Sequence, residues 1–190
     1  MSDTHENIHR ITGIAILAAI SIILQVVGNF VAFGPVSINL CLIPIALGAI
    51  LYGPWGGAIL GAVNGVMVLF AASTLAVFMP VSVIGTILVC LLKCTIAGFV
   101  AGLLCKLLVK HSKILAYCVA GAAVVIINSG LFALGSIIFF MPILKEAGKD
   151  YANAYFYLFI VMIGWNFVFE FLSTTLFTPL LAKLSEKYRQ

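Results

Sequence analysis

Several apolar stretches of this chain are longer than the roughly 20 residues that an α-helix needs to cross the hydrocarbon core of a membrane. Hydrophobic residues make up 64% of the sequence and charged residues only 8%, far from the composition of a soluble domain. The stretches also lack the alternation of polar and apolar residues that marks a membrane β-barrel. The sequence therefore predicts an all-α, polytopic membrane protein.

The length of the chain limits how many times it can cross the membrane. One crossing with its turn takes roughly 25 to 30 residues, so 190 residues hold about six helices and no separate nucleotide-binding or catalytic domain. We expect one compact bundle and a single domain over residues 1–190. The predicted helices cover residues 11–33, 37–52, 55–72, 81–109, 115–140 and 153–181.

The second and third predicted helices are short, and the sequence YGPWGG, residues 52–57, joins them. Pro54 and the glycines end one helix and begin the next, which predicts a tight helical hairpin. Gly57, Gly61 and Gly65 then recur at every fourth position along one helix face. Such small-residue faces let helix backbones approach closely in lipid, and we favour packing inside the bundle over contact with another protein.

The charge distribution predicts that both chain ends lie in the cytoplasm. Six crossings place the ends on one side, and basic residues accumulate on the cytoplasmic side of membrane proteins. On the opposite side Lys145 and Lys149 are balanced by Glu146 and Asp150. The N-terminal sequence MSDTHENIHR lacks the features of a cleaved secretory signal, so we expect the first helix to be retained. The basic residues assigned to the cytoplasmic side are Arg10, Lys106, Lys110, Lys113, Lys183, Lys187 and Arg189.

Polar side chains inside the apolar stretches are rare, and they are the candidate binding residues. Ionisable groups in a bilayer cost several kcal/mol unless they face the bundle interior, a partner or water. The helical rise puts Lys93, Asn128 and Asn166 roughly 16 to 18 Å below the outer ends of three different helices, with Glu170 one turn deeper. We therefore predict a cavity that opens to the outside, with a substrate site formed by Gln25, Asn29, Asn39, Lys93, Asn128, Asn166 and Glu170.

This set of groups suits a small polar organic molecule better than a metal ion, which would want more oxygen anions. Structural alternatives stay open for several members. Asn128 and Asn166 could simply bridge helices, Asn64 is more typical of such a bridge than of a ligand contact, and Lys93 with Glu170 could form a structural ion pair. The five cysteines lie in apolar segments and indicate neither disulfides nor a metal site, and we expect no cofactor.

Three stretches carry a resemblance to a known family. They are NLCLIPIALGAILYGPWGGAILGAVNGVMVLF (residues 39–70), LLKCTIAGFVAGLL (91–104) and WNFVFEFLSTTLFTPLLAKL (165–184). Together they resemble the substrate-binding S components of energy-coupling factor (ECF) vitamin transporters. The motifs that biotin-binding members carry are not found in this sequence.

The resemblance implies a subunit without an ATPase of its own, which captures a vitamin or related micronutrient at the bacterial plasma membrane and delivers it by reorienting in the bilayer. Its implied partners are a transmembrane coupling protein and two cytoplasmic ATPases, with Ala15 and Ala19 of the first helix matching the docking face of the family. The uncharged loop over residues 71–82 is a candidate outer lid. Lys93 favours an anionic ligand; pantothenate is the first candidate, and riboflavin, a folate, a cobalamin or a queuosine precursor remain open.

Two other classes of function fit the residues less well. A small intramembrane enzyme would need an acid, base or nucleophile, yet the three histidines fall outside the predicted spans and no intramembrane serine has an identifiable base beside it. A stand-alone secondary carrier usually shows inverted repeats and helices broken at mid-membrane, and the sequence shows neither clearly. The sequence therefore favours a binding subunit over an enzyme or a carrier.

Overall fold

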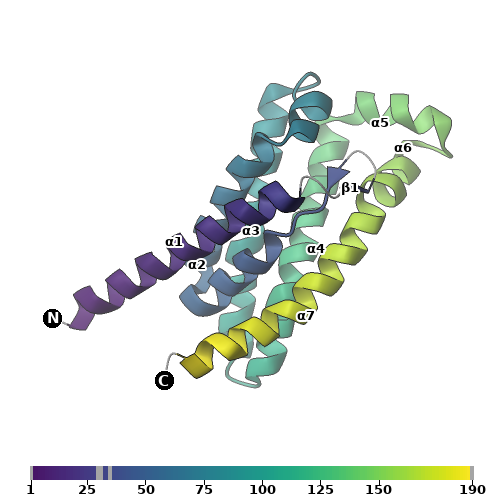
Figure 1. Cartoon of the computed structure of the whole chain (residues 1–190). Helices are drawn as coiled ribbons and strands as arrows, with labels where there is room; N and C mark the ends of the chain where they lie inside the picture. Colours follow the sequence, from purple (N-terminus) through teal and green to yellow (C-terminus); the bar gives the residue numbers. More distant parts are fainter. Residues whose placement is uncertain (1, 29–31, 34–35, 189–190) are drawn as a thin grey trace.

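Long apolar helices dominate the computed structural model of the chain (Figure 1), which describes residues 2–28, 32–33 and 36–188. Within these residues, five helical segments are long and apolar enough to cross a membrane. They are α1 (Ser2–Gly28), α2 (Leu42–Leu69), α3 (Val83–Leu108), α4 (Lys113–Phe139) and a C-terminal segment made of α6 (Ala154–Phe156), η3 (Tyr157–Gly164) and α7 (Trp165–Tyr188).

Helix α2 is bent sharply at Gly53, whose φ of 76° lies in the left-handed region that favours glycine. Pro54 follows and begins the second half of the helix, since it needs no hydrogen bond from its own nitrogen there. A Cβ atom added to Gly57 would lie 2.8 Å from the Cβ atom of Ala49, so the two halves run back along each other. The bend divides α2 into two segments, so the five long helices form six apolar segments. The predicted hairpin and the predicted all-α bundle are confirmed.

The glycine face of α2 packs inside the bundle. Added Cβ atoms on Gly57, Gly61 and Gly65 would each meet the backbone of α3, at Gly98, Cys94 and Cys90 respectively. The two helices therefore touch backbone to backbone along three turns, as expected when helices associate in lipid through small residues. The prediction of packing within the bundle is confirmed.

The second predicted helix, residues 37–52, begins later than expected. A short antiparallel pair of strands, β1 (Ala32–Phe33) and β2 (Val36–Ser37), precedes it, and α2 begins only at Leu42. The physical reason lies at Asn39, whose side-chain oxygen accepts a hydrogen bond from the Cys41 backbone at 3.2 Å. This local bond competes with helix formation and keeps the preceding residues out of the helix.

The segments that join the helices contain short elements that the sequence did not predict. Between α2 and α3 lies the π-helix η1 (Thr74–Phe78), and between α4 and α6 lie α5 (Met141–Ala147) and the 3₁₀ turn η2 (Gly148–Asp150). Figure 1 places both chain ends at one end of the bundle, and α5 and β1 at the other. The short elements thus gather over the end that faces away from the termini.

Candidate functional site

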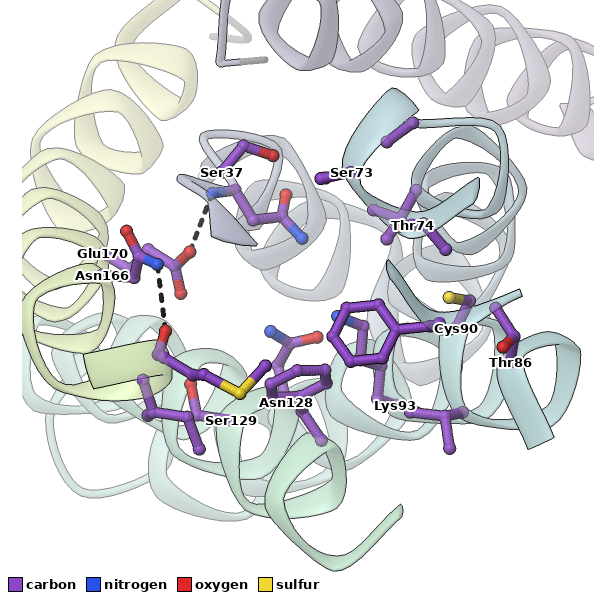
Figure 2. A pocket seen from close by; sticks show the side chains of 18 of the residues that line it. Ser37, Ser73, Thr74, Thr86, Cys90, Lys93, Asn128, Ser129, Asn166 and Glu170 are labelled. Atoms are coloured by element: carbon purple, nitrogen blue, oxygen red, sulfur yellow. Dashed lines mark hydrogen bonds between the residues drawn. The ribbon is translucent and has the colours of Figure 1, made fainter. Parts of the chain in front are cut away.

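A cavity lies in the half of the bundle that is far from the termini, enclosed by α3, α4, η3, α7, the residues around η1 and the segment before α2 (Figure 2). Its volume of about 60 Å³ leaves room for roughly four waters. Six of the seven predicted site residues line this cavity, and Asn29 lies outside the described residues. The six are Gln25, Asn39, Lys93, Asn128, Asn166 and Glu170.

Helical spacing explains why these side chains converge. On α3, Thr86, Val89 and Lys93 follow one another at intervals of three and four residues, and all three line the cavity. Asn166 and Glu170 lie one turn apart on α7 and line it from the opposite side (Figure 2). The depth estimate from helical rise therefore identified side chains that share one space.

Glu170 connects α7 to the extended segment before α2. Its Oε1 atom accepts a hydrogen bond of 2.8 Å from the backbone N–H of Asn39, and both residues are buried. The side-chain oxygen of Asn39 in turn accepts a hydrogen bond of 3.2 Å from Nδ2 of Asn64. Glu170 thus anchors a short stretch of backbone at the cavity wall through one oxygen.

Asn64 lies behind the cavity and joins two of its walls. It is fully buried, and its Nδ2 donates to Sγ of Cys94 at 3.5 Å as well as to Asn39. The Cys94 thiol donates to Oδ1 of Asn128 at 3.4 Å. Asn64 therefore acts as the helix bridge that the sequence indicated, and this bridge positions two cavity amides, Asn39 and Asn128.

A parallel set of contacts reaches α1. The Cys41 thiol donates to the backbone oxygen of Ser21 at 2.9 Å and approaches Oε1 of Gln25 at 3.3 Å. Gln25 is almost completely buried although it lies near the end of α1. These contacts fix α1 to the segment that carries Asn39.

Lys93 is buried at 7% exposure, and its Nζ atom lies 4.8 Å from the centroid of the Phe132 ring. This distance is typical of a cation–π contact. Within the described part of the chain, no ion pair links Lys93 to Glu170. The structural ion pair considered from the sequence is therefore absent, and the ammonium group remains at the cavity wall beside an aromatic face.

One wall of the cavity is aromatic, and it was not among the predicted features of the site. Phe78 of η1 lies 5.8 Å from Phe132 and 5.0 Å from Phe140 between ring centroids, and Met162 of η3 adds to the same wall. Nothing in the sequence separates these rings from the aromatic residues that face lipid. Two π-helices supply lining residues, and such turns are rare and often lie at functional sites.

Five hydroxyl groups also line the cavity without having been predicted: Ser37, Ser73, Thr74, Thr86 and Ser129. Serine and threonine are common in membrane helices, so most of them carry no signal of their own. Thr86 is the exception, because it lies seven residues before Lys93 and therefore on the same face of α3. That spacing could have added Thr86 to the predicted set.

Ala15 and Ala19 lie away from the cavity, on the exposed face of α1. Their large apolar neighbours Ile16, Ile20 and Ile23 are also exposed, at 56%, 42% and 63%. In the described chain, this part of α1 therefore presents an apolar surface with small residues at its centre.

A family model described as the substrate-specific component of ECF transporters matches residues 9–182 of the chain. The match begins in α1 and ends in α7, so it includes every helix that lines the cavity. No curated protein matches the chain significantly.

Proposed function

Because the chain belongs to the family of substrate-specific (S) components of ECF transporters, which are membrane-embedded binding subunits and not enzymes, we propose that its cavity captures a small organic anion for uptake. The observation that carries this proposal is the buried ammonium group of Lys93 at the cavity wall. A buried charge is costly until a partner of opposite sign meets it. A carboxylate on the ligand would be that partner.

The other polar groups of the cavity support a ligand of this kind. Glu170 already uses Oε1 to hold the Asn39 backbone, so Lys93 is the better candidate to meet an incoming charge. Gln25, Asn128 and Asn166 offer amides for hydroxyl or amide groups, and the ring of Phe132 offers an apolar face. A vitamin or related micronutrient with a carboxylate fits this description, and pantothenate is the first candidate.

Binding such a ligand requires the cavity to open further. Its present volume of about 60 Å³ would hold roughly four waters, which is less than a whole vitamin needs. The uncharged segment over residues 71–82 supplies Ser73, Thr74 and Phe78 to the lining. We expect this segment to act as the lid that moves aside for the ligand and closes over it.

Family membership also implies an energy-coupling module as partner. We expect its transmembrane coupling protein to dock on Ala15 and Ala19, and its two cytoplasmic ATPases to drive delivery. The chain would act as a single domain, residues 1–190, in the bacterial plasma membrane with both ends in the cytoplasm. The basic residues near the chain ends and in the turn between α3 and α4 support that orientation.

The proposal is tested by calorimetric titration of the purified protein in lipid nanodiscs against a panel of vitamins, with pantothenate first. We expect one carboxylate-bearing member to bind, and Lys93→Met to weaken it more than tenfold. Lys106→Met is the matched control, since Lys106 is an exposed lysine on the same helix. If folded protein binds no vitamin, the proposed function is wrong; if Lys93→Met leaves the affinity unchanged, the role of Lys93 is wrong.

Docking is tested separately, by uptake in cells that also express the coupling module. Ala15→Phe with Ala19→Phe should abolish uptake, because bulky rings would hold the coupling protein away from α1. Ligand affinity of the purified variant should stay within about twofold, since neither residue lines the cavity. Leu107→Phe, at an exposed position of α3, is the control that should retain uptake.

A further inference from the structure

A second hollow lies next to the cavity, as a groove between α4 and the π-helix η3. Ile126, Gly130 and Ala133 line it from α4, and Phe159 and Gly164 line it from η3. Ile126 and Phe159 are about half exposed, so the groove opens on the outer surface of the bundle. The volume of the groove is about 330 Å³.

The groove and the cavity share part of their walls. Ser129, Ile163 and Phe167 line both of them, so these side chains form part of the partition between the two spaces. Ser129 is drawn beside Asn128 at the edge of the cavity (Figure 2). Side chains change rotamer on a much shorter timescale than helices move relative to one another. The partition can therefore open without any change in the fold.

We propose that the groove receives an apolar part of the same molecule whose anionic end is held at Lys93, so that the ligand is an amphipathic organic acid. This inference rests on the function proposed above. The closed polar cavity is too small for a whole ligand, and the groove is an open apolar space directly beside it. Among the described residues that line the groove, Ser129 has the one polar side chain, so a polar group placed there would lose its hydration without compensation.

The local structure of both walls favours an adaptable apolar site. Gly130 and Gly164 carry no side chains to fill the space, and the π-helix η3 replaces the tighter α-helical turn on one side. A Cβ atom added to Gly130 would meet nothing within 4 Å. A side chain introduced at this position would therefore occupy the groove without disturbing the packing of the bundle.

Titration of the protein in nanodiscs with butanoate, hexanoate and octanoate tests the inference, with empty nanodiscs as the blank. Affinity should rise about threefold to fourfold for each added methylene that enters the groove. Octanedioate should bind more than tenfold more weakly than octanoate, because its second carboxylate would enter an apolar space. Lys93→Met should weaken all the acids, since they share the anionic end.

The variant Gly130→Phe should remove the dependence on chain length, so that the three monocarboxylates bind within about threefold of one another. Gly130→Leu is a second variant with a smaller side chain, and Ile138→Phe is a control at an exposed site of the same helix. The inference is wrong if affinity does not depend on chain length, or if that dependence persists in both Gly130 variants. Either result would indicate that the groove holds only bilayer lipid.

The two proposals fail in different ways. If the native protein binds a member of the vitamin panel but none of the acids, the amphipathic ligand is wrong and the binding subunit stands. If pantothenate, which has no long apolar chain, binds and the Gly130 variants bind it equally well, the same conclusion follows. If nothing binds to folded protein, the proposed function is wrong as well.

Discussion

Helix α3 packs in opposite ways on its two functional faces. Toward α2 it presents Cys90, Cys94 and Gly98, whose backbones meet the glycines of α2 directly. Toward the cavity it presents Thr86 and Lys93, whose side chains line that space. Cys90 belongs to both faces, because its backbone meets Gly65 and its side chain lines the cavity. One helix thus contributes both to a close backbone contact and to the wall of a cavity.

The difference shows how a small membrane bundle can hold a cavity at all. Association in lipid lacks the hydrophobic drive that operates in water, so it depends on close packing of backbones. The contact between α2 and α3 supplies that packing, and the cavity side can then be lined by long, adaptable side chains. We expect substitutions on the first face to act on folding and those on the second to act on binding.

The largest effect should come from adding bulk to the face between α2 and α3. In Gly61→Val the new Cβ atom would meet the carbonyl of Cys94, which belongs to the backbone and cannot rotate away. The helices must separate, so we expect the free energy of unfolding to fall by about 3 kcal/mol or more. Unfolding by denaturing detergent, followed by circular dichroism, measures this loss.

Gly130→Ala is the matched control for that experiment. Its added methyl group meets nothing within 4 Å, and alanine is favoured over glycine in a helix by about 0.5 to 1 kcal/mol. The control should therefore be neutral or slightly stabilising. Equal losses in the two variants would mean that the two regions do not differ in packing as the structure indicates.

The parts of this molecule that could be predicted are those for which the membrane allows few alternatives. Lys93 and Glu170 stand out because ionisable residues are costly in lipid, and helical rise then gives their depth. The glycine face stands out because few other residues allow backbones to touch. The long apolar stretches predicted the bundle, Pro54 and the glycines predicted the hairpin, and the rarity of polar side chains in those stretches predicted the six cavity residues.

The parts that could not be predicted depend on contacts between distant segments or on residues without a distinctive composition. The segment that holds Asn39 is extended partly because Glu170 accepts its N–H, across 131 positions of sequence. The aromatic wall around Phe78 uses the same residue type that faces lipid elsewhere. Neither the extended segment at Asn39 nor the aromatic wall can be predicted from a local pattern of the sequence.

A smaller effect is expected at Asn64, which connects the two regions. Replacing it with leucine removes the hydrogen bonds to Asn39 and Cys94, and we expect a loss of about 1 to 2 kcal/mol in unfolding free energy. Ligand affinity should fall as well, because Asn39 and Asn128 lose the bridge that positions them. Val66→Ala, at an exposed site of the same helix half, should change neither quantity by more than about 0.5 kcal/mol. If Asn64→Leu lowers the unfolding free energy but leaves the ligand affinity unchanged, Asn64 contributes to helix packing and not to the binding site.

The smallest effect should appear on the cavity face, between Lys93 and Phe132. The ammonium lies 4.8 Å from the ring centroid in a buried setting, where such a contact contributes about 1 kcal/mol. Each single substitution also changes packing, so the contact is isolated by a double-mutant cycle with Lys93→Met and Phe132→Leu. We expect Phe132→Leu to lower the unfolding free energy by about 1 kcal/mol more when Lys93 is present than in the Lys93→Met background. A coupling near zero would show that the ring only fills space, and Lys93 would then depend on the ligand alone to offset its burial.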